Sequence, residues 1–115
     1  MLTDQVKMDF RILVVDDSEF SRASVIKILK DNGFNVVGEA ASAEACMKML
    51  KEKKPHLVLT DVVMPMASGI ELAEKITKTY REISVIVFSS LKNEHIIMEA
   101  IKAGALDFLQ KPIKI

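Results

Sequence analysis

The sequence predicts an α/β protein in which helices wind around both faces of a five-stranded parallel sheet. Five short apolar runs alternate along the chain with four segments whose apolar residues recur at helical spacing. The runs show little alternation of polar and apolar residues, which is typical of strands covered on both faces. Because strands and helices alternate, parallel strands joined by right-handed crossovers are expected, and the predicted fold is doubly wound.

Each predicted strand is a short run of β-branched and other apolar residues bounded by turn-forming residues. Pro55 marks the start of the third run, and Asp61 follows that run at the head of a loop containing Pro65. The expected strands cover residues 12–15, 34–38, 57–59, 83–88 and 106–110.

Helix signals occupy the four segments between these runs. The first helix is expected over residues 20–32, and Ser42 caps a second that Pro55 closes. The third begins with a capping box at residues 68–71, in which a serine and a glutamate each bond the other's backbone N–H. The fourth presents isoleucine and alanine side chains on one face and ends at Gly104.

Composition indicates one domain and excludes several classes of protein. The 115 residues, half of them hydrophobic, suffice for a single core, which we place at residues 10–115 after an N-terminal leader at 1–9. Sixteen basic and sixteen acidic residues cancel, so nothing indicates direct nucleic-acid or membrane binding. The single Cys46 excludes an intrachain disulfide, and no apolar run reaches the roughly 20 residues of a membrane span. We expect a cytoplasmic protein.

Polar residues follow four of the predicted strands, at the edge where α/β proteins bind ligands. Asp16 and Asp17 follow the first run, Asp61 the third, Ser89 the fourth and Lys111 the fifth. Three carboxylates within about 5 Å repel by roughly 3 kcal/mol per pair at an effective dielectric of about 20, so the cluster needs cations. Lys111 supplies one charge. Mg²⁺ suits the remaining oxygens because it binds carboxylates and keeps waters that a phosphate can replace.

A metal beside a carboxylate, a lysine and a hydroxyl indicates phosphoryl transfer, which depends on positioning and charge neutralisation. Taken singly, Asp16 and Asp17 are equally typical of a helix cap, and Asp61 of a turn. Their occurrence together with Ser89 and Lys111 favours the site.

The ordered motifs resemble the receiver domain of two-component response regulators, in particular single-domain chemotaxis regulators and the receivers of chemotaxis methylesterases. The resemblance spans residues 10–112 and implies a flavodoxin-like sheet in the order 2-1-3-4-5. The motifs that carry it are Asp16-Asp17-Ser18, Asp61-x-x-Met64-Pro65 followed by Gly69, Ser89, and Ala103-Gly104-Ala105 leading through Phe108 to Lys111-Pro112.

The resemblance implies that Asp61 accepts a phosphoryl group from a sensor histidine kinase or a phosphotransfer protein. Asp16, Asp17, Asp61 and the backbone carbonyl of Val63 would hold Mg²⁺, and Lys111 would pair with the phosphoryl oxygens. Such a protein is a regulator rather than an enzyme, because its chemistry is limited to its own phosphorylation and dephosphorylation.

The resemblance also implies a switch. Ser89 would bond the phosphoryl group, Phe108 would turn inward, and the Lys111-Pro112 bond would be cis. The surface around the fourth helix and the last strand would then change and control a target protein or an attached output domain. The same surface would also serve as a dimer face. Phe108 is equally typical of plain core packing.

The sequence departs from the family pattern in three places. Residues 64–69 read Met-Pro-Met-Ala-Ser-Gly where many relatives read Met-Pro-x-Met-Asp-Gly, although Ser68 still caps the helix. Val63 and Leu91 are apolar at two positions where, in this family, the side chain controls how easily water reaches the acyl phosphate. Apolar side chains there favour slower hydrolysis of the acyl phosphate. The helix that usually follows the last strand is absent, so we expect an exposed apolar sheet face there, or a cover supplied by a longer chain or another subunit.

Two alternatives remain. A receiver-like binding module that is never phosphorylated stays open, although the complete acidic and basic set argues against it. A phosphatase of the haloacid dehalogenase type carries Asp-x-Asp after its first strand, and Asp16-Asp17-Ser18 lacks that spacing. A P-loop nucleotide switch is excluded because no G-x-x-x-x-G-K-[ST] motif occurs.

Overall fold

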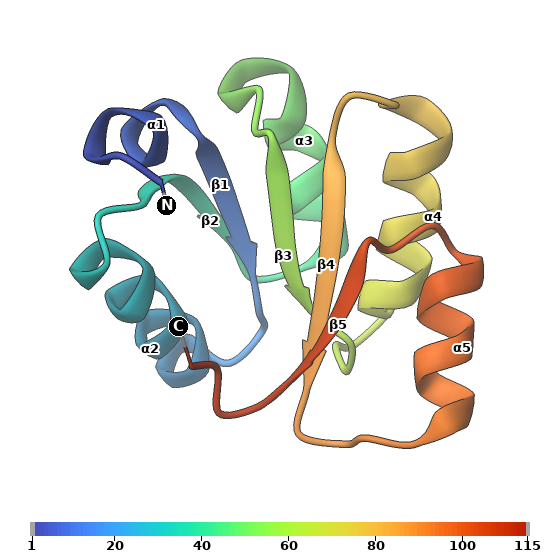
Figure 1. The fold of residues 1–115 in the computed structure, drawn as a ribbon. Helices are drawn as coiled ribbons and strands as arrows, with labels where there is room; N and C mark the ends of the chain where they lie inside the picture. The colour runs from blue at the N-terminus through green and yellow to red at the C-terminus, as the bar shows by residue number, and fades with distance from the viewer. Residues whose placement is uncertain (1, 115) are drawn as a thin grey trace.

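A computed structural model describes residues 2–114 and contains one five-stranded sheet in the order β2-β1-β3-β4-β5 (Figure 1). All neighbouring strands are parallel, which confirms the predicted doubly wound, flavodoxin-like fold and its strand order. The strands are β1 (Arg11–Val15), β2 (Asn35–Ala40), β3 (Leu57–Asp61), β4 (Ser84–Ser89) and β5 (Asp107–Gln110).

Capping side chains determine where most of the helices begin. Ser18, Ser42 and Ser68 each accept a backbone N–H from the first turn of the following helix, and the capping box of Ser68 and Glu71 is present as predicted. The helices described are α1 (Asp4–Asp9), α2 (Glu19–Asp31), α3 (Ala43–Lys53), α4 (Gly69–Thr79) and α5 (Glu94–Lys102).

The two faces of the sheet carry separate apolar clusters. The larger cluster joins the sheet to α3, α4 and α5 through residues such as Leu50, Ile76 and Ala100. The smaller cluster joins the opposite face to α2, and Ile113 adds to it where the chain runs back towards α2 after β5 (Figure 1). Burial of these side chains against the sheet provides most of the driving force for folding.

Within residues 111–114 no helix follows β5, so in the described part of the chain α2 alone covers the second face. Leu57, Ile86 and Leu109 on that face remain half-buried.

The N-terminal segment differs from what the sequence indicates. Its aperiodic pattern predicts no helix, whereas residues Asp4–Asp9 form one, with the Thr3 hydroxyl accepting the N–H of Val6. The Lys7 ammonium donates to the carbonyl of Asn32 at 2.9 Å, so the helix is held by a contact between distant parts of the chain. Met1 lies outside the described residues.

Strand β2 extends to Ala40, beyond the end predicted at residue 38. Val15 pairs with Ala40, and the Ala40 carbonyl then accepts the N–H of Asp16 at 3.0 Å. This additional pairing extends the hydrogen bonding of the sheet to Asp16, the first residue of the loop after β1.

None of the helices between residues 2 and 114 has the length and apolar character needed to cross a bilayer.

Candidate functional site

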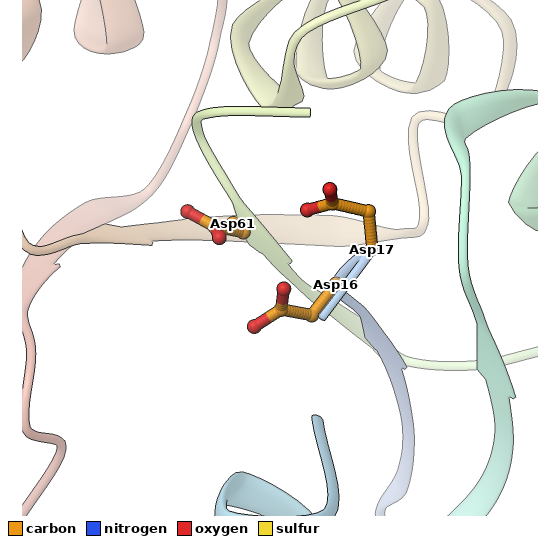
Figure 2. A group of neighbouring side chains, drawn as sticks. All are labelled: Asp16, Asp17 and Asp61. Carbon is orange, nitrogen blue, oxygen red and sulfur yellow. The ribbon is translucent and has the colours of Figure 1, made fainter. Parts of the chain in front are cut away.

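The carboxyl ends of β1 and β3 bring three carboxylates together, as the sequence predicts. Asp16 and Asp17 follow β1, and Asp61 is the last residue of β3 (Figure 2). One oxygen from each carboxylate lies within 4.8 Å of the others. Because β1 and β3 are neighbours in the sheet, this proximity is a direct consequence of strand order.

Lys111 supplies the cation that the cluster requires. Its Nζ lies 3.1 Å from Asp61 Oδ2 and 3.5 Å from Asp16 Oδ2. The ammonium also lies 5.1 Å from the centre of the Phe88 ring, whose negative face attracts a cation. Ring and carboxylates together hold the lysine head group at the edge of the sheet.

Asp61 is 7% exposed, and its environment acts on its ionisation in opposing directions. Burial raises the pKa of Asp61, and the neighbouring Asp16 carboxylate also raises it. The ion pair with Lys111 and the hydrogen bond from the Val63 N–H lower the pKa, but the net shift is upward from the ordinary value. Burial therefore makes the charged carboxylate costly, while Lys111 limits that cost.

The two aspartates after β1 have different surroundings. Asp16 is fully buried, and its Oδ1 accepts the N–H of Ser18 at 3.0 Å. Asp17 is exposed, and within the described residues its carboxylate makes no hydrogen bond or ion pair. Asp17 is thus free to bind a ligand from solvent.

Gly69 allows the start of α4 to approach the backbone of Asp61 closely. Its N–H donates to the carbonyl of Val62 at 2.9 Å. A Cβ at this position would overlap the carbonyl oxygen of Asp61 and lie 2.9 Å from its carbonyl carbon. The glycine in the sequence motif is therefore required by the approach of two backbone segments.

The predicted switch residues occupy the neighbouring strand ends. Ser89 is 1% exposed, its Oγ accepts the N–H of Leu91 at 3.0 Å, and its carbonyl accepts the N–H of Lys111 at 2.9 Å. Phe108 is half-buried against the larger apolar cluster. The Lys111-Pro112 peptide bond is cis, as the resemblance implies.

The donor set fits a hard divalent cation. Three carboxylates, two buried and one exposed, offer oxygens to a common space, and Mg²⁺ takes oxygen ligands and commonly retains several waters. Val63 and Leu91 donate their backbone N–H groups to Asp61 Oδ1 and Ser89 Oγ, and the apolar side chains of both are more than half exposed. The carbonyl of Val63 remains a predicted ligand.

Two residues near the site were not singled out by the sequence. The ring of Phe88 contacts the Lys111 ammonium. The only sign of this residue in the sequence is an aromatic side chain just before the end of a predicted strand. Arg22 donates through Nη1 to the carbonyl of Asp16 at 2.7 Å. Nothing in the sequence distinguishes this arginine from other cations on helix surfaces.

Two kinds of comparison relate this chain to known proteins. The family model of the response regulator receiver domain matches residues 12–115. The chemotaxis protein CheY of Thermotoga maritima is 37% identical over 107 residues, which cover 93% of this chain and 89% of the relative.

Solved structures extend the agreement to the fold. The chain in the CheX-CheY-BeF3-Mg complex from Borrelia burgdorferi matches with a TM-score of 0.88 and 28% identity, over 98% of this chain and 86% of that chain. The response regulator domain of Thermotoga maritima CheB matches with a TM-score of 0.81 and 37% identity, over 92% of this chain and 83% of that chain. The chain belongs to the response regulator receiver domain family.

Proposed function

We propose that this receiver domain is a phosphorylation-activated signalling switch in which Asp61 is the phosphoacceptor. The observation that carries the proposal is the pairing of Lys111 with Asp61 at 3.1 Å beside the carboxylates of Asp16 and Asp17. A nucleophile, a fixed cation and a set of metal-binding oxygens meet there at one sheet edge, as phosphoryl transfer requires.

The transfer begins with a phosphohistidine on a sensor histidine kinase or a phosphotransfer protein. A carboxylate oxygen of Asp61 attacks phosphorus, a P–O bond forms, the P–N bond breaks, and the electron pair stays with the imidazole of the donor. The ammonium of Lys111 follows the negative charge from the carboxylate to the phosphoryl oxygens. Hydrolysis of the acyl phosphate later returns Asp61 and releases phosphate.

Mg²⁺ is the cofactor we assign to Asp16, Asp17, Asp61 and the carbonyl of Val63. When bound, it neutralises charge on the phosphoryl group. The buried Asp16 is held by its bond to Ser18, and the exposed Asp17 is open to solvent. The CheY neighbour from Borrelia burgdorferi was solved with Mg²⁺ and BeF3, which supports this assignment by analogy.

Phosphorylation is read out through Ser89 and Phe108. Ser89 Oγ now accepts a bond from Leu91, and we propose that it turns to donate to a phosphoryl oxygen instead. Movement of the loop after β4 then opens space for Phe108, which packs on the cluster beneath α5. Charge at Asp61 is in this way converted into a change of surface.

The output surface lies on α5 and β5, the helix and strand that the sequence places fourth and fifth. Met98 and Ile101 on α5, and Leu106 just before β5, are about half exposed or more, which suits a face that binds a protein. The bound partner is a target protein, an attached output domain or a second copy of the domain. The protein acts as a cytoplasmic regulator without activity on other substrates.

The intact mass after incubation with acetyl phosphate tests this function. We expect the wild type to gain about 80 Da, one phosphoryl group, only when Mg²⁺ is present. Asp61→Asn removes the nucleophile and leaves a side chain of equal size, so we expect no gain. A folded wild type that binds Mg²⁺ but gains no mass would contradict the proposal and favour a binding module that is not phosphorylated.

A further inference from the structure

We propose that Arg22 is a positioning residue that holds the loop of the Mg²⁺-binding carboxylates in place. Its Nη1 donates to the backbone carbonyl of Asp16 at 2.7 Å, and its Nε donates to Glu39 Oε1 at 2.8 Å. The residue thus ties α2 and the edge strand β2 to the loop after β1. This inference rests on the proposed function, because the role of Arg22 is to position the carboxylates that we propose to bind Mg²⁺.

The contacts of Arg22 differ from those of ordinary surface ion pairs in this chain. The Arg22 side chain is 15% exposed, whereas Lys27, five residues further along α2, is 75% exposed in its pair with Asp31. Exposed pairs of that kind contribute little to stability. Arg22 is instead packed beside the loop, and its planar fork reaches two acceptors in fixed directions.

The carbonyl that Arg22 binds belongs to the peptide unit joining Asp16 to Asp17. Pairing with β2 ends at Val15, apart from the bond from the Asp16 N–H to Ala40. The orientation of the next peptide plane is therefore not set by the sheet. The bond from Arg22 fixes this plane, and with it the direction in which the backbone leads into Asp17.

Asp17 depends on this backbone more than its two neighbours do. Asp16 is held by Ser18 and Lys111, and Asp61 by Val63 and Lys111. The carboxylate of Asp17 is exposed and has no hydrogen bond or ion pair within residues 2–114. Its position relative to the other two carboxylates therefore follows from its backbone, which is held by the bond from the Ser18 N–H to Asp16 Oδ1 and by the peptide plane that Arg22 binds.

Charge and position predict opposite effects when Arg22 is removed. A cation close to the carboxylates repels Mg²⁺, so the loss of its charge alone should tighten binding. Loss of the bond to the Asp16 carbonyl should weaken binding, because the three oxygens are no longer held together. Groups that orient metal ligands typically change metal affinity by roughly 10- to 100-fold when they are removed.

The test is calorimetric titration with MgCl₂ at constant ionic strength for the wild type, Arg22→Met, Arg22→Lys and Lys27→Met. We expect Arg22→Met to bind about tenfold more weakly. Arg22→Lys keeps the charge but cannot donate to both acceptors in the same geometry, so it should also bind more weakly. Lys27→Met loses one charge from the same helix and should change the affinity by less than about twofold, because exposed charges are screened.

Thermal unfolding of each variant without Mg²⁺ separates positioning from folding. Weaker binding by a variant that is folded at the titration temperature supports the proposal, and Arg22→Lys serves if Arg22→Met does not fold. Unchanged or tighter Mg²⁺ binding by a folded Arg22 variant would overturn the role proposed for Arg22. It would leave the proposed function of the domain in place. Absence of Mg²⁺ binding by the wild type would overturn the proposed function itself.

Discussion

The ammonium of Lys111 lies 3.1 Å from Asp61 Oδ2, although the two residues are 50 positions apart in the chain. The contact exists because β3, β4 and β5 are consecutive neighbours in the sheet and end at the same edge. It opposes the burial that makes the charged form of Asp61 costly. The ionisation of Asp61 is therefore set by the fold as much as by the residue type.

Replacing Lys111 by methionine should raise the pKa of Asp61 further, because burial would act without its main opposing charge. The rate of phosphorylation by acetyl phosphate should fall by about 10²-fold, as is typical when one group that stabilises transition-state charge is removed. The pKa is measured by NMR titration of the Asp61 carboxyl carbon, and the rate by intact mass. Lys102→Met, exposed on α5, is the matched control; equal rates for the two variants would exclude this role of Lys111.

Asp61→Asn should stabilise the folded protein near neutral pH. An acid whose pKa is raised on folding binds its proton more tightly in the folded state. Its contribution therefore favours folding below the ordinary pKa of 3.8 and is lost as pH rises through the higher folded value. The asparagine avoids that loss, so its advantage in the free energy of unfolding should be larger at about pH 7 than at about pH 4.

Urea unfolding at both pH values measures this difference. Glu99→Gln, on the exposed surface of α5, is the control and should show no comparable dependence on pH. A destabilised Asp61→Asn at neutral pH would mean that the pair with Lys111 outweighs burial.

Mg²⁺ should stabilise the wild type through the three carboxylates. A ligand that binds only the folded state adds about 1.4 kcal/mol for each tenfold rise in concentration above its dissociation constant. Asp17→Asn keeps the size of the side chain and removes one charged ligand, so the increase should be largely lost. Thermal unfolding across a series of MgCl₂ concentrations measures it, and a full response in Asp17→Asn would remove Asp17 from the ligand set.

Gly69→Ala should destabilise the protein by about 1–3 kcal/mol, because the added methyl group overlaps the Asp61 carbonyl. The same displacement should slow phosphorylation, since it moves the backbone of Asp61, the proposed phosphoacceptor. Gly38→Ala is a close control: its methyl group would meet only side-chain atoms at 3.6 Å and beyond. Chemical unfolding of both variants checks the prediction. A similar loss of unfolding free energy in the two variants would contradict it, because the backbone at Asp61 would then move aside at little cost.

Much of the fold and of the site could be predicted because the information is local. Apolar runs mark the strands, and serine caps mark three of the helices. The order of the strands, implied by the resemblance, then brings Asp16, Asp61 and Lys111 together. These residues could be identified because each directly follows or ends a strand.

The parts that could not be predicted depend on contacts between distant segments. Helix α1 is short and lacks an apolar period, and it is fixed by the bond from Lys7 to Asn32. Arg22 is one of many cations on helices, and only the structure directs it at the carbonyl of Asp16. Sequence pattern carries no signal for either contact.

The most direct test of the account is to locate the phosphoryl group on the chain. Borohydride reduces an aspartyl phosphate to homoserine, so treatment after phosphorylation leaves a stable mark at the modified residue. We expect peptide mass spectrometry to find homoserine at position 61 of the wild type, only in samples that received both Mg²⁺ and acetyl phosphate. Homoserine at Asp16 or Asp17, or at no position in a sample that gained mass, would contradict the assignment of Asp61 as the phosphoacceptor.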